Sequence, residues 1–473
     1  MWQRRLARHA VTLRGPLADA PTTMLRLPPR LRHELRETLR LAAPLVLGQL
    51  SAIGMNVVDT LLAGHYSSQT LAAVAIGANV WVLAIVAAIG VMMAMPPSVA
   101  HRHGAGESES IGALLRQALW LAAAIGVILF FAVRHAGTLL RVMGIAPDIA
   151  AQAQLFLHAI SWGAPALTGY FALRGFSEGL ALTRPTMYFG AFGLALLAPV
   201  GYVFMYGAFG LPAHGAQGSG MATATVLWVQ FAAFAAYIAR RRHYTIYAPF
   251  ARWQWPQPGT IVELLRLGVP MGISLFMEAS LFVTAALLIG SLGPDIVAGH
   301  QIAINVASIT FMVPLGVAMA TTVRVGRAAG SGDADGARWA GYAGIGASLA
   351  SQLVSCALMA LFPHAIAALY TGDATVAAVA AQLLLFAAAF QFSDGIQVTA
   401  NGALRGLKDT TGPMAITTLA YWGIGMPAGY LLCFHFGHGA PGMWTGLIAG
   451  LSVAAVLLFV RFALESRGIA ARA

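Results

Sequence analysis

Twelve apolar segments, each about as long as a membrane-spanning helix, recur along this chain. An α-helix needs about 20 predominantly apolar residues to cross the hydrocarbon core of a bilayer. The pattern therefore predicts an all-α integral membrane protein with twelve transmembrane helices. The segments are 41–63, 71–99, 112–133, 150–173, 186–208, 218–239, 262–290, 298–323, 339–362, 376–403, 413–435 and 441–464.

The charged residues support this prediction and orient the chain. Only 10% of the residues are charged, against about 25% in a soluble domain, so there are too few charges to cover a water-facing surface. The net charge of +11 would suggest nucleic-acid binding in a soluble protein, but here the arginines lie between apolar segments. They gather at both termini and in the even-numbered connections, whereas the odd-numbered connections hold only Arg134 and Arg141. The positive-inside rule then places both termini in the cytoplasm.

The chain also repeats itself at an offset of 226 residues. This offset sets Pro44 against Pro270 and Gly104 against Gly330 without a gap. With small changes of offset, three further motifs match. They are ALRG at 172–175 and 403–406, P-x-G-Y at 199–202 and 427–430, and HGA-x-G at 214–218 and 438–442.

Two six-helix halves of the same orientation follow from this repeat. We expect a pseudo-twofold axis along the membrane normal, an arrangement found in transporters that hold substrate between their halves. Much of the basic N-terminal arm, which holds nine arginines, is expected to be disordered or to lie on the inner membrane surface. The predicted units are the arm (1–40), the N-terminal half (41–239), a cytoplasmic linker (240–261), the C-terminal half (262–464) and a cytoplasmic tail (465–473).

Four acidic residues lie in or at the end of apolar segments: Asp59, Glu178, Glu278 and Asp394. An ionised carboxylate in hydrocarbon costs at least a few kcal/mol. Each must therefore face a wet cavity, bind a cation or a proton, or pair with another group. Glu278 and Asp394 have no basic residue beside them in mid-segment, so we interpret them as a cation-coupling site that could hold Na⁺. Asp59 either joins this function or bonds a neighbouring helix.

Other polar residues fall into two groups. Gln397, one turn after Asp394, and three residues of one helix, His300, Gln301 and Asn305, are candidates for supporting the cavity, although a lone histidine is more often a packing residue. The arginines of the two ALRG motifs lie near acids. We expect these residues, Arg174 with Glu178 and Arg405 with Asp409, to fix the cytoplasmic helix ends or gate them.

Four long segments together resemble the multidrug and toxic compound extrusion (MATE) family, in its NorM-like bacterial branch. They begin LAAPLVLGQLSAIGMNVVDT, GVPMGISLFMEAS, VAGHQIAINVAS and QFSDGIQVTANGALRGLKD, and the resemblance runs from about residue 40 to 460. It implies an antiporter of the bacterial inner membrane that exports cationic, amphipathic compounds against Na⁺ or H⁺. The family's coupling acids correspond here to Asp59, Glu278 and Asp394.

One departure from the family pattern concerns the fifth helix. The NorM-like pattern has asparagines on both sides of a proline, where this chain has Leu197 and Gly201 around Pro199. This difference weakens the expectation of a cation site in the N-terminal half and favours Glu278 and Asp394.

Two other functions were weighed against the drug antiporter. A flippase for a lipid-linked precursor should line its cavity with several basic residues for pyrophosphate, and the arginines here are expected near the cytoplasmic ends. An intramembrane enzyme should carry a GxGD or HExxH motif, and neither stands in an apolar segment. We therefore predict no enzymatic activity, no cofactor beyond the coupling ion, no nucleic-acid partner and a monomer in the lipid bilayer.

Overall fold

The computed structural model describes residues 29–142, 145–208 and 210–470, and every regular element in these ranges is a helix. The first half of the chain contains α1 (Pro29–Tyr66), α2 (Ser68–Met92), α3 (Met95–Gly104), α4 (Ser108–Arg134), α5 (Gly137–Val142), α6 (Pro147–Ile160), α7 (Ala164–Gly179), α8 (Arg184–Tyr202) and α9 (Gly215–Arg240). The short α10 (Arg242–Thr245) lies in the linker. The second half contains α11 (Pro258–Gly290), α12 (Pro294–Gly330), α13 (Ala334–Leu361), α14 (Pro363–Ala368), α15 (Ala374–Gly406), α16 (Thr411–Thr418), α17 (Met426–Tyr430) and α18 (Gly439–Ala470).

Ten continuous helical stretches in the described ranges are long and apolar enough to span a membrane. The two other predicted segments are helical but interrupted. Segment 150–173 is divided between α6 and α7 by a 3₁₀ turn at Ser161–Gly163. Segment 413–435 alternates α16 and α17 with π-helical turns at Leu419–Gly425 and Leu431–His435. The predicted all-α membrane fold with two six-helix halves is confirmed.

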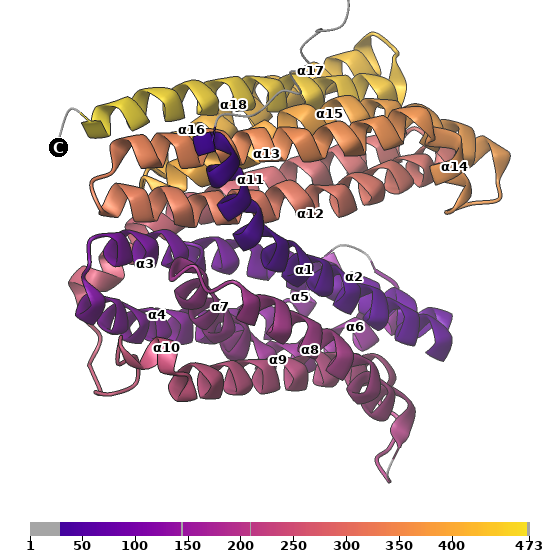
Figure 1. The fold of residues 1–473 in the computed structure, drawn as a ribbon. Coiled ribbons are helices and arrows are strands. Elements are labelled where there is room, and N and C mark those ends of the chain that lie inside the picture. Colours follow the sequence, from indigo (N-terminus) through magenta and orange to yellow (C-terminus); the bar gives the residue numbers. More distant parts are fainter. Residues whose placement is uncertain (1–28, 143–144, 209, 471–473) are drawn as a thin grey trace, which may run out of the picture.

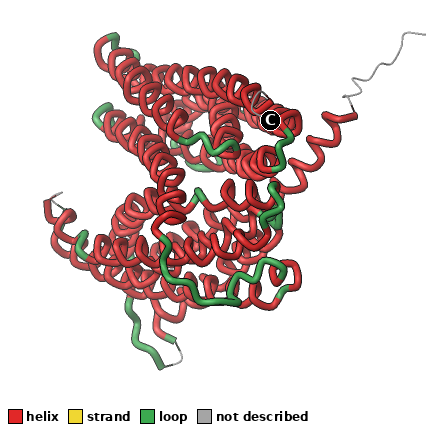
Figure 2. Tube along the Cα trace, turned by 90° about the vertical axis from the view of Figure 1, so that its left-hand side faces the viewer, coloured by secondary structure: helices red, strands yellow, loops and turns green. Residues whose placement is uncertain are grey.

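The two halves form two bundles that lie one above the other (Figure 1). The view along the molecule in Figure 2 shows the same pair of bundles, built of helices joined by short loops. The repeat in the sequence reappears in local geometry. In both halves the P-x-G-Y motif leads directly into a five-residue π-helical turn, Val203–Gly207 in one and Leu431–His435 in the other.

The bundles meet mainly at one end of the molecule, here called the basic end, which carries α3, α10 and the end of α18 (Figure 1). Gly104 there lies against the main chain of Arg327, and Gly330 lies against the main chain of His101. Neither site has room for a β-carbon. Both the glycines and the residues that they touch are related by the 226-residue offset. The contact between the halves is therefore itself nearly twofold symmetric.

The N-terminal parts of α1 and α11 each pack on the opposite half. Leu45 of α1 lies in a buried cluster with Val317 and Ala320 of α12. Leu264 and Leu267 of α11 lie in the core of the N-terminal half. This exchange is visible for α1, whose beginning reaches across to the other bundle (Figure 1). Apolar side chains of each half are therefore buried in the core of the other half.

Two ion pairs join the halves at the basic end. Arg102 of α3 donates to Glu263 of α11 at 2.8 Å, and Arg324 of α12 pairs with Glu34 of α1. Lys408, in the same half as Glu263, also contacts the Glu263 carboxylate, at 3.2 Å.

The second ion pair involves the last part of the predicted arm over residues 1–40. Residues 29–40 are the start of α1. Arg324 donates there to the Glu34 carbonyl and to the Thr38 hydroxyl, both at 2.6 Å, so this part of the arm is tied to the other half. The rest of the predicted arm, residues 1–28, lies outside the described residues.

The linker between the halves folds back on α4. Gln117 donates to the Trp255 carbonyl at 3.0 Å, and Trp120 donates to the Gln254 carbonyl at 2.9 Å. Away from the basic end, several apolar residues of α1 and α11 remain exposed in matching pairs. Val57 is 51% exposed and its repeat partner Val283 is 56% exposed. The halves thus pack closely at the basic end and leave these outer helix faces uncovered.

Candidate functional site between the halves

A cavity of about 250 Å³ lies between the two halves. Helices α1, α2, α3 and α7 of the first half and α11, α12 and α15 of the second contribute side chains to it. Most of its wall is apolar. Its polar lining consists of Gln49, Arg174, Glu178, Glu278, Thr322 and Arg405, and its methionines and phenylalanines are Met92, Met93, Met319, Phe171 and Phe311.

Glu278 of α11 lines this cavity, as the sequence predicts for a coupling acid. Its carboxylate makes no hydrogen bond to any other described residue, and it lies within electrostatic range of Arg405. Asp394 of α15 is only 5% exposed and lies within electrostatic range of Glu278. The two predicted acids therefore lie within electrostatic range of each other on two different helices, and of the two only Glu278 lines the cavity.

Two further buried polar atoms, one of them on a residue one turn after Asp394 in α15, lack partners among the described residues. The Tyr421 hydroxyl is one, on a side chain that is 0% exposed, and the Gln397 Oε1 atom is the other. Tyr421 lies within electrostatic range of Glu278, Asp394 and Arg405. Buried polar atoms are nearly always hydrogen-bonded. Unsatisfied oxygen atoms beside two carboxylates are the surroundings expected for a bound cation, a proton or water.

Tyr421 is a residue that sequence reasoning missed. It lies in the π-helical turn Leu419–Gly425, which is held beside Glu278 because Trp422 donates to the Met277 carbonyl at 3.2 Å. Its segment, TLAYWGIG, reads in the sequence as ordinary apolar helix. Only the P-x-G-Y motif that follows, with its partner in the other half, marks this helix as irregular.

The arginines of the two ALRG motifs lie near helix ends, as predicted, and also line the central cavity, which was not predicted. Arg405 is in the last turn of α15, and Arg174 lies five residues before the end of α7. Polar side chains bind them in place of loop carbonyls: Glu178 and Gln49 bind Arg174, and Asn401 binds Arg405.

Arg174 makes the expected pair with Glu178, at 2.6 Å. The arginine also donates to Gln49 at 2.8 Å, and Thr186 donates to Glu178 at 3.1 Å. All of this pair is buried. Its two charges cancel, and Gln49 and Thr186 add hydrogen bonds of the kind that a buried ion pair requires.

Arg405 does not pair with Asp409. Its Nε atom donates to Asn401 at 3.2 Å, whereas Asp409 accepts from Arg461 at 2.5 Å and from the Gly412 amide at 3.3 Å. Asp409 therefore holds the loop that follows α15 against α18. Arg405 faces Glu278 across the cavity lining.

Asp59 lies apart from this site, in α1 against α9. Ser219 and Thr223 donate to its two carboxylate oxygens at 3.3 and 3.1 Å. It does not line the central cavity. Nearby, Leu197 is buried in an apolar cluster with Ala222 and Val226, so the departure noted in the fifth helix leaves this part of the N-terminal half apolar.

The three polar residues of α12 are not brought to the cavity. His300 is buried and accepts a hydrogen bond from Trp444 at 3.2 Å, which is a packing role. Asn305 accepts from Tyr370 at 3.0 Å at the exposed surface. Gln301 is exposed. Their i, i+1, i+5 spacing puts them on different faces of the helix, so they do not form one polar stripe.

The geometry of this site can be set beside known proteins. The MatE family model matches residues 44–203 and again 270–431, one match in each half. The chain is 50% identical over 445 residues to the "Probable multidrug resistance protein NorM" of Xanthomonas campestris pv. campestris, covering 94% of this chain and 97% of the relative. It is 43% identical over 446 residues to the "Multidrug resistance protein PmpM" of Pseudomonas aeruginosa, covering 93% of each chain.

Solved structures share the fold. The eukaryotic MATE transporter AtDTX14 superposes with a TM-score of 0.84 at 18% identity, covering 94% of this chain and 99% of its own. A multidrug resistance MATE family transporter in an outward-facing conformation also gives 0.84, at 21% identity, covering 93% of this chain and 98% of its own. The chain belongs to the MATE family and is a multi-pass multidrug efflux transporter of its NorM-like branch, not an enzyme.

Proposed function

We propose that the protein is an antiporter that exchanges a cationic, amphipathic compound for Na⁺ or H⁺ at Glu278 and Asp394. The observation that carries this proposal is the charge balance between the halves. Arg174 and Glu178 neutralise each other. Arg405 can balance only one of the two remaining carboxylates. One negative charge is therefore left uncompensated in a medium where that is costly.

A single monovalent cation completes the balance. A proton on either carboxylate, a sodium ion beside Tyr421 and Gln397, or the positive group of a drug would each do so. Competition between drug and coupling ion follows directly, because both neutralise the same charge. The same charge balance supports a stoichiometry of one coupling cation for each monovalent drug cation.

The shape of the cavity favours flat, apolar cations of varied structure. Methionine and phenylalanine side chains make up much of its wall. Methionine is flexible and polarizable, so such walls repack around different ligands. A cation released outward leaves the site charged again, and the halves return once the site is neutralised.

We further propose that the basic end faces the cytoplasm of a bacterial inner membrane and that the protein works as a monomer. The arginine-rich connections all support this orientation through the positive-inside rule. Single cysteines in a background without Cys356 and Cys433 test it. Ser67→Cys should react with an impermeant reagent from the periplasm and Ser331→Cys from the cytoplasm, and the reverse pattern would refute the orientation.

The decisive experiment measures drug binding to purified protein across Na⁺ concentration and pH. Wild type should bind drug more weakly as Na⁺ or H⁺ rises, and the drug must weaken ion binding by the same factor. Glu278→Gln and Asp394→Asn should remove this competition. Asp335→Asn, a change of an exposed acid at the basic end, is the matched control. Wild-type competition in both neutralised variants would refute the shared site.

A flippase for a lipid-linked precursor is the second candidate, because two arginines do line the cavity. Glu178 already neutralises Arg174, which leaves Arg405 alone opposite two carboxylates. A pyrophosphate would meet a net negative site. Efflux of ethidium from vesicles, with Na⁺ and pH gradients imposed separately, distinguishes the two functions and identifies the coupling ion.

A further inference from the structure

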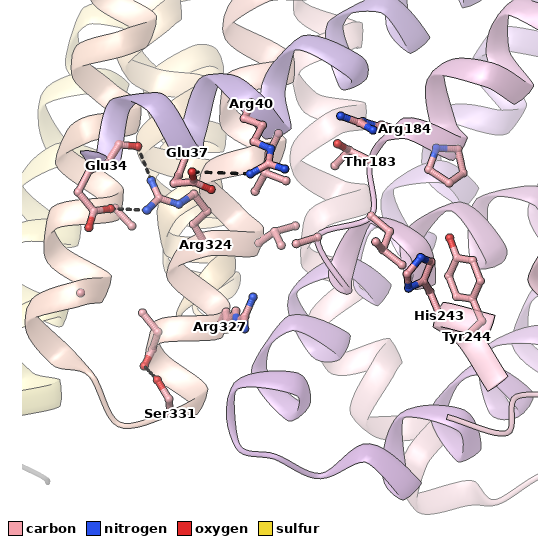
Figure 3. Close-up of a pocket in the computed structure, with 18 of the residues that line it drawn as sticks. Glu34, Glu37, Arg40, Thr183, Arg184, His243, Tyr244, Arg324, Arg327 and Ser331 are labelled. Atoms are coloured by element: carbon pink, nitrogen blue, oxygen red, sulfur yellow. Dashed lines mark hydrogen bonds and ion pairs between the residues drawn. The ribbon is translucent and has the colours of Figure 1, made fainter. Parts of the chain in front are cut away.

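A second cavity, of about 760 Å³, lies at the basic end between the two halves. Figure 3 shows it enclosed by the first turns of α1, the start of α8 and the end of α12. It is separate from the central site, and the two cavities share no lining residue. Nothing in the proposed exchange cycle uses it.

The lining of this cavity is rich in arginine. Arg324 is engaged by Glu34, and Arg40 has only a loose contact with Glu37 at 4.0 Å. Arg184 of α8 and Arg327 of α12 line it as well.

The guanidinium groups of Arg184 and Arg327 make no ion pair and no hydrogen bond with any described residue. The one other acid in the lining, Asp333, accepts a hydrogen bond from the Gly336 amide at 2.8 Å and so caps the start of α13. Two guanidinium groups, one from each half, are thus left without an acidic partner around a common space (Figure 3).

The repeat explains why the space is there. Glu37 and Arg40 of α1 correspond to Glu263 and Arg266 of α11, in the shared pattern E-x-x-R-L-x-x-P. Beside Glu263 of α11, Arg102 of the other half fills the space and forms an ion pair. The residue that corresponds to Arg102 beside α1 is Ala328. Its methyl group leaves open, beside Glu37, the volume that the Arg102 side chain fills beside Glu263.

We propose that this cavity binds a phosphate-bearing anion between Arg184 and Arg327. Arginine is suited to this role because its planar fork can donate two hydrogen bonds to one phosphate. Basic pockets between transmembrane helices are a recognised site for phospholipid head groups. Arg184 is also the first residue of α8, and no side chain caps that helix start, so its positive end adds to the attraction.

A bound anion would bridge the two halves. It would favour the state in which the start of α8 and the end of α12 line one cavity, as they do here. Since a ligand shifts a conformational equilibrium only through different affinities for the two states, opening of the basic end must weaken anion binding. The site would thereby couple the transport cycle to an anion that is not transported.

The test measures binding in two arms, using the full-length protein in nanodiscs. In the first arm pyrophosphate is titrated into neutral phosphatidylcholine discs and followed by calorimetry. In the second arm retention of phosphatidylglycerol is followed by native mass spectrometry. Binding in the first arm assigns a soluble phosphate, and binding in the second alone assigns a lipid head group. Both results support the site, whereas binding in neither arm overturns it.

Two variants locate the anion. Arg184→Gln and Arg327→Gln should each weaken binding about tenfold, since each removes a charge-assisted bond. Arg36→Gln, also exposed on α1 but outside the cavity lining, is the matched control and should bind as wild type does. All three positions are exposed, and thermal unfolding would check that the fold is kept. Equal binding by Arg184→Gln, Arg327→Gln and wild type would overturn the proposal.

Discussion

The two halves of this transporter share their helix order, their glycine contacts and the π-helical turn after P-x-G-Y, but they use acidic residues differently. In the C-terminal half Glu278 and Asp394 lie together beside the unsatisfied Tyr421 hydroxyl. In the N-terminal half Glu178 is neutralised by Arg174, and Asp59 lies outside the cavity and accepts from two hydroxyl groups. The repeat partners of Asp59 and Glu278 are alanines, Ala285 and Ala52.

This difference shows that the glycine contacts are kept in both halves, whereas the acidic residues are not. Where Gly104 and Gly330 touch the main chain of the other half, both copies retain glycine, because a β-carbon has no room there. Charges act over longer distances and can be supplied by either half. In the proposed mechanism one charged site between the halves is enough for exchange, so Asp59 can serve as a hydrogen-bonded structural residue.

The largest effect should follow from neutralising the C-terminal acids. We expect Glu278→Gln or Asp394→Asn to reduce gradient-driven ethidium efflux by at least about 100-fold, since neutralisation removes the charge for which drug and ion compete, and each factor of ten corresponds to ~1.4 kcal/mol. Vesicle efflux, normalised to the amount of folded protein, is the measurement. Asp335→Asn should transport normally, and comparable efflux in all three variants would contradict the comparison.

A side chain at the contact between the halves should have the next largest effect. Gly104→Ala and Gly330→Ala each place a methyl group against a main-chain carbonyl of the other half, so we expect about a tenfold loss of efflux from each. Because the two contacts are symmetric, the losses should be similar.

Gly346→Ala provides the control for these glycines. It also adds a methyl to a helical glycine, but into open space. Alanine is favoured over glycine in a helix by about 1 kcal/mol, so this variant should be as stable as wild type or slightly more stable. Equal losses at all three glycines would mean that the helices, and not the contact, are affected.

The sequence was sufficient to predict the helices and to identify Glu278 and Asp394 as buried acids inside the membrane, for physical reasons that also explain what it leaves out. Apolar runs of membrane length and mid-segment carboxylates are both rare outside their functions, so the segments and Glu278 with Asp394 could be found. An apolar run does not reveal whether its helix is interrupted, and the breaks in segments 150–173 and 413–435 were not predicted.

What the sequence does not predict concerns polar groups whose environment depends on tertiary packing. Arg174 and Arg405 lie near helix ends, as predicted, but nothing local shows that they also line a cavity. The helix over residues 29–40 is not predicted either, since its partner Arg324 is 290 residues away in the chain. Tyr421 gave no signal at all, because a buried tyrosine without a partner resembles any other apolar residue in the sequence.

The ion pairs at the basic end should have a smaller effect than the glycines. Arg102→Gln and Arg324→Gln each remove one partly buried pair between the halves. We expect the basic end to open about three- to tenfold more often in each, since such pairs lose much of their attraction to desolvation. The measurement is the reactivity of a cysteine at Met319, in the central cavity, toward an impermeant reagent added at the basic end. Exchanging the charges, with Arg324→Glu and Glu34→Arg together, should restore low reactivity, and failure to do so would show that the pair itself does not hold the halves.

The smallest effect should come from Asp59→Asn, and this variant tests the comparison most directly. Asparagine keeps an oxygen that can accept from Ser219 or Thr223 at the observed 3.1 to 3.3 Å, so the contact between α1 and α9 should survive. We expect efflux to slow by no more than about threefold, the factor given by ~0.7 kcal/mol. Competition between drug and Na⁺ or H⁺ should be unchanged, because the charge that they share lies in the other half. Drug binding across Na⁺ concentration and pH, measured beside Glu278→Gln, gives the answer. If Asp59→Asn loses competition as completely as Glu278→Gln does, the N-terminal half holds a second coupling site. The hydroxyl groups of Ser219 and Thr223 would then bind the coupling ion together with Asp59, and would not merely hold Asp59 in place.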